Sequence, residues 1–152
     1  MADLKYYSIA STAGSLRIIS TTAEKLDKVV AGLAADQFGV QADTLREIES
    51  SDIPADSDRD FRDAWEDTGS AISVNMDKAR TVFLSKIRRV RNAELVKKDV
   101  DYIRAIEAND GTASDVATAK QTLRDLPATT DLSGASTPTE LRALWPSELP
   151  DE

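Results

Sequence analysis

Residues 77–109 are DKARTVFLSKIRRVRNAELVKKDVDYIRAIEAN, a long stretch without glycine or proline. Because those two residues interrupt helices more than any others, the stretch predicts one helix of roughly 30 residues, about 45 Å long. The apolar face of this helix drifts near Asn92, which predicts a kink or a change of packing partner there. Its apolar residues follow a helical period: Ala79, Phe83, Ile87, Val90, Leu95, Val96, Val100, Ile103 and Ile106.

The chain after this stretch is predicted to turn back on itself. Asn109-Asp110-Gly111 is a strong helix stop and turn. Residues 113–126 then repeat apolar residues three and four apart, and Pro127 is expected to end this second helix. Because the connection is short, the two helices should form an antiparallel hairpin.

A third, short helix is predicted near the C-terminus. Thr137-Pro138-Thr139-Glu140 combines a helix cap, proline at the first helical position and a capping-box glutamate. Trp145 lies on the apolar edge of this helix, and Pro146 should stop it. Residues 147–152 are acidic and contain proline, so we expect an extended, mobile tail.

The N-terminal part has the pattern of strands followed by a helix. Residues 4–10 and 16–20 are rich in β-formers and flank a small-residue loop, which predicts a β-hairpin. Residues 21–24 (Thr-x-x-Glu) form a capping box for a helix expected to end near Ala35. Residues 45–49 favour a third strand over a helical turn.

Between these parts lies the octet 58–65, Asp-Arg-Asp-Phe-Arg-Asp-Ala-Trp. Asp58 is a plausible helix cap, and Phe61 and Trp65, four residues apart, would share one helical face. The predicted fold is therefore α+β and helix-dominated, with a β-hairpin–helix unit, a long helical hairpin and a short C-terminal helix. The segments are 1–50 (β/α unit), 51–76 (linker with the aromatic anchor), 77–127 (helical hairpin) and 128–152 (linker, short helix and acidic tail).

The composition argues against catalysis and against a cofactor. The sequence has neither histidine nor cysteine, which removes the usual general base, the thiol nucleophile and the imidazole and thiolate metal ligands. Asp99 and Asp101 alternate like metal-ligating carboxylates, but on a helix they point in different directions and no glycine-containing calcium loop follows. No apolar run approaches membrane-spanning length, and the N-terminus lacks the apolar core of a signal peptide.

Charge is unevenly distributed along the chain, whose net charge is −8. Residues 77–98 carry eight basic and two acidic side chains, so this segment is +6 within a remainder of −14. Arg88 and Arg91, three residues apart, are neighbours on a helix and are candidates for partner binding. Nucleic-acid binding is the weaker interpretation, because the cluster 86–91 spreads around the helix and no aromatic residue is interleaved for base stacking.

Two aromatic positions offer a structural and a functional interpretation. Phe61 and Trp65 either dock their segment onto the protein's own long helix or form an exposed anchor for a partner. Arg59 and Arg62 flank them and would either pair with neighbouring aspartates or bind a carboxylate of another subunit. Trp145 is equally suited to capping the core and to anchoring a neighbour.

The order of several motifs resembles a group of small tailed-bacteriophage proteins associated with tail and tail-fibre modules, some described as tail assembly chaperones. The resemblance covers residues 51–146 and leaves residues 1–50 outside. Its motifs are, in order, Ile53-Pro54, the octet, Met76-Asp77-Lys78-Ala79-Arg80, Arg88-Arg89-Val90-Arg91-Asn92, Asp99-Val100-Asp101-Tyr102-Ile103-Arg104-Ala105, Leu123-Arg124-Asp125-Leu126-Pro127 and Thr137-Pro138-Thr139-Glu140-Leu141.

This resemblance implies a virion protein, assembled in the host cytoplasm, that binds other phage virion proteins in several copies. The alternatives are a transient tail-fibre assembly chaperone absent from the virion, and a phage nucleic-acid-binding protein that uses the basic helix. On the first interpretation the candidate partner-binding residues are Arg59, Phe61, Arg62, Trp65, Arg88, Arg91 and Trp145.

Overall fold

A computed structural model of the chain describes residues 4–35, 39–109 and 111–151. The predicted α+β, helix-dominated class is confirmed. The chain divides into two compact units, residues 1–79 and 80–152. Residues 51–76, which we predicted as a linker, instead contribute strands and core side chains to the first unit.

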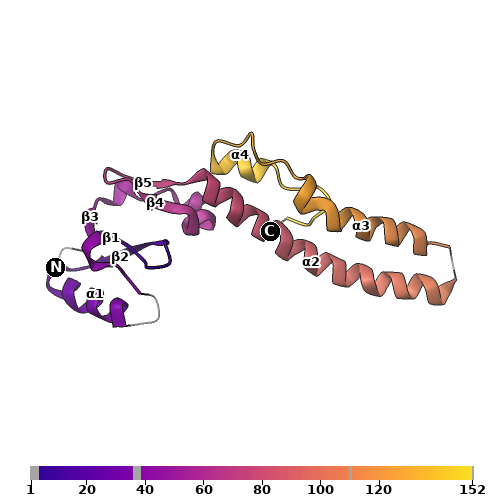
Figure 1. The fold of residues 1–152 in the computed structure, drawn as a ribbon, viewed down its shortest axis with the longest axis horizontal. Coiled ribbons are helices and arrows are strands. Elements are labelled where there is room, and N and C mark those ends of the chain that lie inside the picture. The colour runs from indigo at the N-terminus through magenta and orange to yellow at the C-terminus, as the bar shows by residue number, and fades with distance from the viewer. Residues whose placement is uncertain (1–3, 36–38, 110, 152) are drawn as a thin grey trace. The chain divides into compact units, whose positions relative to one another are not determined.

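The first unit is built on a three-stranded antiparallel sheet in the order β2-β1-β3 (Figure 1). The predicted hairpin is confirmed, and its turn contains Gly14 at a φ of 80°, which a glycine adopts without steric cost. The third strand predicted near residues 45–49 is also present. The strands are β1 (Lys5–Ala10), β2 (Leu16–Thr21) and β3 (Arg46–Ile48).

The capping box predicted at residues 21–24 is wrong. Thr21 is the last residue of β2, pairs with Lys5 and is buried, so the chain stays extended through this position. A 3-10 turn, η1 (Ala23–Lys25), follows Thr22 without a side-chain cap and leads into α1 (Leu26–Ala35). This helix extends to Ala35, near its predicted end, and the next residues lie outside the described part of the chain.

The octet does not form the short helix that we predicted. It lies mostly in a 3-10 segment, η4 (Asp56–Ala64), which begins after Ala55 and not at Asp58, and whose regular geometry is interrupted at Phe61. Trp65 has left the helix and starts a strand, with a ψ of 139°. Phe61 and Trp65 therefore do not share a helical face, because backbone pairing of Trp65 with Val74 holds the chain extended there.

A second, two-stranded sheet joins this region to the long helix. It consists of β4 (Trp65–Asp67) and β5 (Ile72–Val74), connected by a turn with Gly69 at a φ of 85°. Asn75 then caps the long helix, because its Oδ1 accepts the backbone N–H groups of Asp77 and Lys78 at 3.0 and 3.1 Å. Two further 3-10 turns, η2 (Ala42–Thr44) and η3 (Ser50–Asp52), complete the unit.

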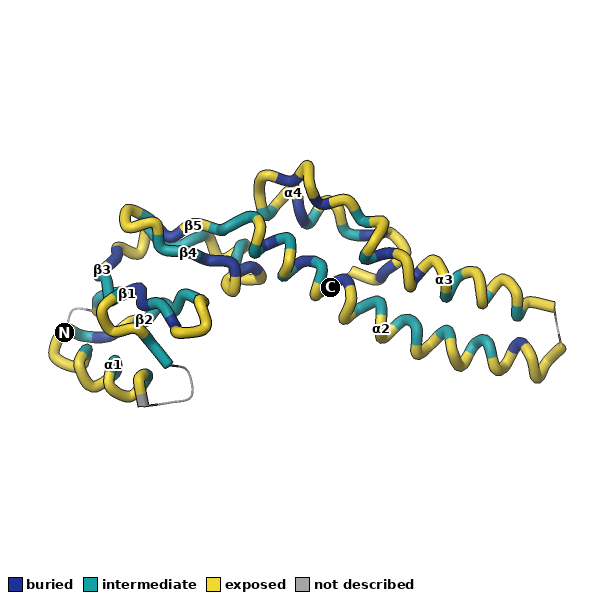
Figure 2. The backbone as a smooth tube through the Cα atoms, viewed as in Figure 1, coloured by how far each residue is buried: buried dark blue, intermediate teal, exposed yellow. Residues whose placement is uncertain are grey.

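The predicted long helix is confirmed as α2 (Met76–Ala108), which continues past Asn92. The drift of its apolar face corresponds to a change in burial: Phe83 and Ile87 are buried, whereas Val96, Val100, Ile103 and Ile106 are exposed (Figure 2). Asn109 ends the helix in the left-handed conformation, with a φ of 51° and its N–H bonded to the Ala105 carbonyl.

In the second unit, α2 and α3 (Ala113–Thr129) form the predicted antiparallel hairpin (Figure 1). Lys120 Nζ lies 2.7 Å from Asp99 Oδ1 and 4.9 Å from the centroid of the Tyr102 ring. Closer to the start of α2, Arg91 Nη1 donates to the Arg124 carbonyl at 3.1 Å. Later residues of α2 thus contact earlier residues of α3, so the two helices run in opposite directions.

We predicted that Pro127 ends α3, but the helix continues to Thr129. A proline this close to the C-terminal end removes only one helical hydrogen bond. The last turn also gains hydroxyl contacts, since Thr130 Oγ1 donates to the Leu126 carbonyl at 2.7 Å.

The C-terminal helix α4 (Pro138–Ala143) begins with the predicted capping box. The tail after it differs from our expectation of an extended segment. Leu149 is buried, its N–H donates to the Pro146 carbonyl, and Trp145 Nε1 donates to the Pro150 carbonyl at 3.1 Å. These contacts turn the tail back onto the second unit. None of the helices in the described part of the chain is long and apolar enough to cross a membrane.

Candidate functional site

Trp65 is the centre of the candidate site in the first unit. The residue is 8% exposed and belongs to a core cluster with Ile48 and Ile72. Tyr6, Leu16, Ile18, Ile53 and Val74 pack around this cluster. Trp65 therefore packs against the sheets of its own unit.

An open pocket of about 560 Å³ lies beside this cluster. One side comes from β1 and β2, and the other from the loop before η4, from η4 itself and from Trp65. We call it the β2–η4 groove. Its lining residues are Tyr6, Ser15, Leu16, Arg17, Ile18, Ser20, Ile53, Arg59, Arg62, Asp63 and Trp65.

The groove is rich in hydrogen-bond donors. Three arginines and one aspartate line it, although the first unit as a whole holds fifteen acidic and eight basic side chains. Arg59 Nε pairs with Asp56 at 2.9 Å, and both side chains are largely exposed. Such an exposed pair contributes little, so Arg59 is easily recruited by another carboxylate.

Three further donors in the groove have no hydrogen-bond acceptor among the residues that the structure describes. They are the guanidinium of Arg62, the hydroxyl of Tyr6 and the indole N–H of Trp65, which is buried. A buried N–H without a partner costs free energy, so a ligand that supplies an acceptor would gain from binding here. The arrangement suits a ligand that carries a carboxylate next to an apolar group.

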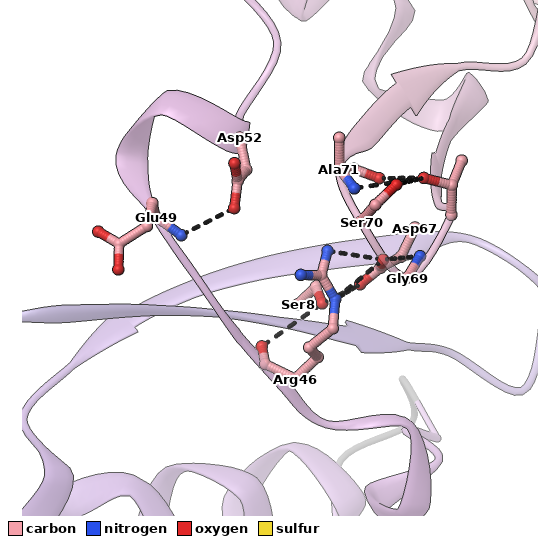
Figure 3. A network of polar contacts seen from close by, with 9 residues as sticks. Ser8, Arg46, Glu49, Asp52, Asp67, Gly69, Ser70 and Ala71 are labelled. Atoms are coloured by element: carbon pink, nitrogen blue, oxygen red, sulfur yellow. Dashed lines mark hydrogen bonds and ion pairs between the residues drawn. The ribbon is translucent and has the colours of Figure 1, made fainter.

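A second polar feature surrounds Asp67 of β4 (Figure 3). Arg46 Nη2 and Nε lie 2.7 and 3.0 Å from Asp67 Oδ1, and Nε also lies 2.8 Å from Oδ2. The buried Ser8 hydroxyl donates to the same carboxylate, as does the Gly69 N–H at 2.8 Å. This network ties β1, β3 and β4 together and so holds one wall of the groove.

The Arg46 guanidinium, with smaller contributions from Ser8 and Gly69, lowers the pKa of the Asp67 carboxyl from 3.8 to about 2. A carboxyl whose pKa is lowered by folding stabilises the protein above its unfolded pKa and loses that contribution as the pH falls through its folded pKa. The contribution of Asp67 should therefore be complete above about pH 5 and disappear toward about pH 2.

We expect Asp67→Asn to lower the free energy of unfolding of the first unit by about 1–2 kcal/mol at neutral pH, allowing for solvent screening. The difference from the unmodified protein should shrink steadily as the pH is lowered from about 5. Urea denaturation at a series of pH values measures the loss of unfolding free energy and how this loss changes with pH. A difference that stays constant over that range would show that the ion pair does not set the pH dependence.

The other predicted site residues have different surroundings. Phe61 is fully buried and unavailable to a partner. In the second unit, Arg91 is engaged with α3 and Arg88 is exposed. Trp145 packs edge-on against Phe83 with ring centroids 5.6 Å apart, and its Nε1 is bonded to Pro150. Of the seven candidate partner-binding residues predicted from the sequence, three line the groove: Arg59, Arg62 and Trp65.

The sequence analysis missed Tyr6 and Arg17, which line the groove from the N-terminal hairpin. Neither has a local signal, because both lie some 40 residues or more before the octet and meet it only through the sheet. The described residues hold no group of three or more acidic side chains placed to bind a metal ion. Comparison of the chain with protein-family models, curated proteins and solved structures finds no match.

Proposed function

We propose that this protein is a structural or assembly component of the bacteriophage tail or tail-fibre region. It acts by binding other virion proteins and not by catalysis. The observation that carries the proposal is the β2–η4 groove, in which the octet that bears the resemblance to phage proteins supplies Arg59, Arg62 and Trp65. Unpaired hydrogen-bond donors beside the apolar side chains of the Trp65 cluster are suited to binding a protein segment.

The chemistry of the sequence also supports binding over catalysis. With no histidine or cysteine, a reaction would depend on carboxylates, lysine or tyrosine. Asp67, a carboxyl whose pKa is lowered by Arg46, is engaged by Arg46 and Ser8. It is therefore a structural group, because its negative charge is already neutralised.

The test is mass spectrometry of purified phage particles from an infection in which this chain is expressed. We expect the protein at a constant ratio to the tail proteins. Arg62→Glu should reduce its incorporation, because a carboxylate would then face the acceptor of the partner. Arg104→Glu is the matched control, since Arg104 is exposed on α2 and does not line the groove.

The possible outcomes separate the alternatives. A protein that is needed for fibre attachment but missing from finished particles would be a transient assembly chaperone. A protein that is absent from particles and dispensable for assembly, but retained on a polyanion resin with a steep salt dependence, would instead be a nucleic-acid-binding protein.

A further inference from the structure

Most of the exposed large apolar side chains in the described part of the chain lie on the second half of α2. They are Val96, Val100, Ile103 and Ile106, which are 64%, 44%, 56% and 54% exposed. Single exposed apolar residues are ordinary on a protein surface, whereas several that lie together mark an interaction site. The second half of α2 therefore presents an apolar surface that the fold of one chain leaves exposed.

Three of these side chains form a stripe along α2 together with the smaller Ala93, which is also exposed. Residues of a helix that are three or four positions apart lie on the same face, and these four are spaced by three, four and three. We call them the α2 stripe: Ala93, Val96, Val100 and Ile103. Ile106 is about 80° from Val96 around the helix and lies beside the stripe.

The stripe is on the side of α2 that faces away from α3. Arg91, whose Nη1 donates to the Arg124 carbonyl of α3, is about 140° from Val96 around the helix. The buried Ala105 is about 180° from Val96. The packing of α2 against α3 therefore leaves the stripe exposed.

The stripe and the charged residues at its two ends have the same spacing in both directions along the helix. Arg89 precedes the stripe by four positions and Glu107 follows it by four, and both side chains are exposed. The six positions are spaced by four, three, four, three and four, which is symmetric about residue 98. A two-fold axis beside residue 98 would therefore align the stripe with that of a second copy running in the opposite direction.

The apolar side chains of such an antiparallel pair are complementary in size. Ala93 would face Ile103 of the second copy, so a small residue opposes a large one on each side of the axis. Val96 would face Val100 of the second copy, closer to the axis. Opposing small and large residues lets two helices interdigitate, so a second copy of α2 fits the stripe.

The charges at the ends of the stripe also favour an antiparallel second copy. Arg89 of each copy would face Glu107 of the other, which places opposite charges together at both ends. In a parallel pair each of these residues would face its own counterpart, and the like charges would repel. The charges therefore distinguish the two directions.

Two charged residues beside the stripe lie close to the axis, where each would approach its own counterpart. Lys97 Nζ lies 2.6 Å from Glu94 Oε1, and Asp99 Oδ1 lies 2.7 Å from Lys120 Nζ. Each therefore has an opposite charge of its own chain beside it. This pairing offsets the repulsion between like charges near the axis.

We propose that two copies of this chain associate through the α2 stripe, with their α2 helices antiparallel. The contact extends over residues 89–107, about 28 Å of helix. It buries few apolar side chains per copy, so we expect a reversible dimer with a Kd of about 10–100 μM. The inference goes beyond the proposed function, because it assigns a second interface and uses no residue of the β2–η4 groove.

Sedimentation equilibrium of the full chain tests the association. Over about 5–500 μM, a range that brackets the expected Kd, the average mass should rise from near that of one chain toward that of two. Ile103→Glu should weaken the dimer by about tenfold or more, because it places a carboxylate in the apolar contact. Ile106→Glu is the matched control beside the stripe, with an expected loss of less than about threefold. Both residues are more than half exposed, so circular dichroism should show an unchanged helix content in both variants.

A charge swap tests the direction of the helices. Glu107→Arg places two like charges together at each end of an antiparallel pair and should weaken it by about three- to tenfold. Adding Arg89→Glu reverses the other charge and should restore the affinity. In a parallel pair, Glu107→Arg would leave like charges facing each other as before, and the second substitution would restore nothing.

A distance measurement tests the direction independently. The chain has no cysteine, so Ala108→Cys provides a single attachment point for a spin label at the end of α2. Ala108 is ten positions from the axis, which places the two labels about 30 Å apart along an antiparallel pair. A parallel pair would hold them about 10–20 Å apart, since packed helices are separated by about 8–10 Å.

Four results would overturn the inference. A chain that stays monomeric up to about 500 μM, well above the expected Kd, would refute self-association. If Ile103→Glu nevertheless reduced incorporation into particles, the stripe would bind a different virion protein. Equal losses for Ile103→Glu and Ile106→Glu would refute the stripe as the contact. Labels about 10–20 Å apart in the dimer would refute the antiparallel arrangement.

Discussion

Replacing Phe61 by alanine is expected to lower the free energy of unfolding of the first unit by about 3–5 kcal/mol. Phe61 is 0% exposed, so the truncation removes a whole buried ring and leaves a cavity. The free energy of unfolding of a small domain is only about 5–15 kcal/mol. The expected loss for Phe61→Ala is a large fraction of this free energy. In a unit of this length each kcal/mol corresponds to a decrease in Tm of about 4–8 °C.

The two tryptophans allow the units to be followed separately. Trp65 lies in the first unit and Trp145 in the second, and the chain has no other. In a Trp145→Phe background, fluorescence during urea denaturation reports the first unit. Phe61→Leu is the control, with an expected loss of about 1–2 kcal/mol because leucine fills much of the space.

A change of less than about 0.5 kcal/mol for Phe61→Ala, the level of an ordinary surface substitution, would contradict a core role. If incorporation into particles failed at the same time, Phe61 would be an interface anchor, which is the functional alternative that the sequence left open.

Leu141→Ala is expected to destabilise the second unit by about 2–5 kcal/mol, whereas Leu144→Ala should cost less than about 1 kcal/mol. Leu141 is 0% exposed in α4 and Leu144 is 37% exposed at the end of the same helix. The two substitutions remove the same atoms, so the difference between them isolates burial. The capping box formed by Thr137 and Glu140 is unchanged in both.

The measurement uses Trp145 fluorescence in a Trp65→Phe background. Trp145 packs against Phe83 of α2, so its signal follows the attachment of the C-terminal segment to the long helix. Equal losses for the two variants would mean that α4 is held by its capping interactions and not by Leu141.

Elements with strong local signals were predictable. The long helix, its stop at Asn109 and the capping box at Thr137 follow from residues a few positions apart, because helix hydrogen bonds and caps are themselves local. The β-hairpin is also local, since a short turn connects its strands. In each of these elements, the groups that interact are close in the sequence.

The errors occurred where a distant contact outweighed the local preference. Trp65 had a helical spacing to Phe61, but pairing with Val74 and packing against Ile48 hold it in a strand. The C-terminal tail had the composition of an extended segment, but the hydrogen bond from Trp145 and the burial of Leu149 turn it back. Burial of an apolar side chain is worth about 1.5–3 kcal/mol, more than the local propensities that it overrides.

The sequence by itself determined the helix-dominated class, the extent of α2, its turn into α3 and the absence of histidine and cysteine. Only the tertiary structure decided that Trp65 of the octet belongs to a core cluster of the first unit. It also brought Arg17 and Tyr6 of the N-terminal hairpin to Arg62. Sheet formation joins segments some 40 residues apart, and a periodicity measured along the chain carries no information about which distant segments will meet.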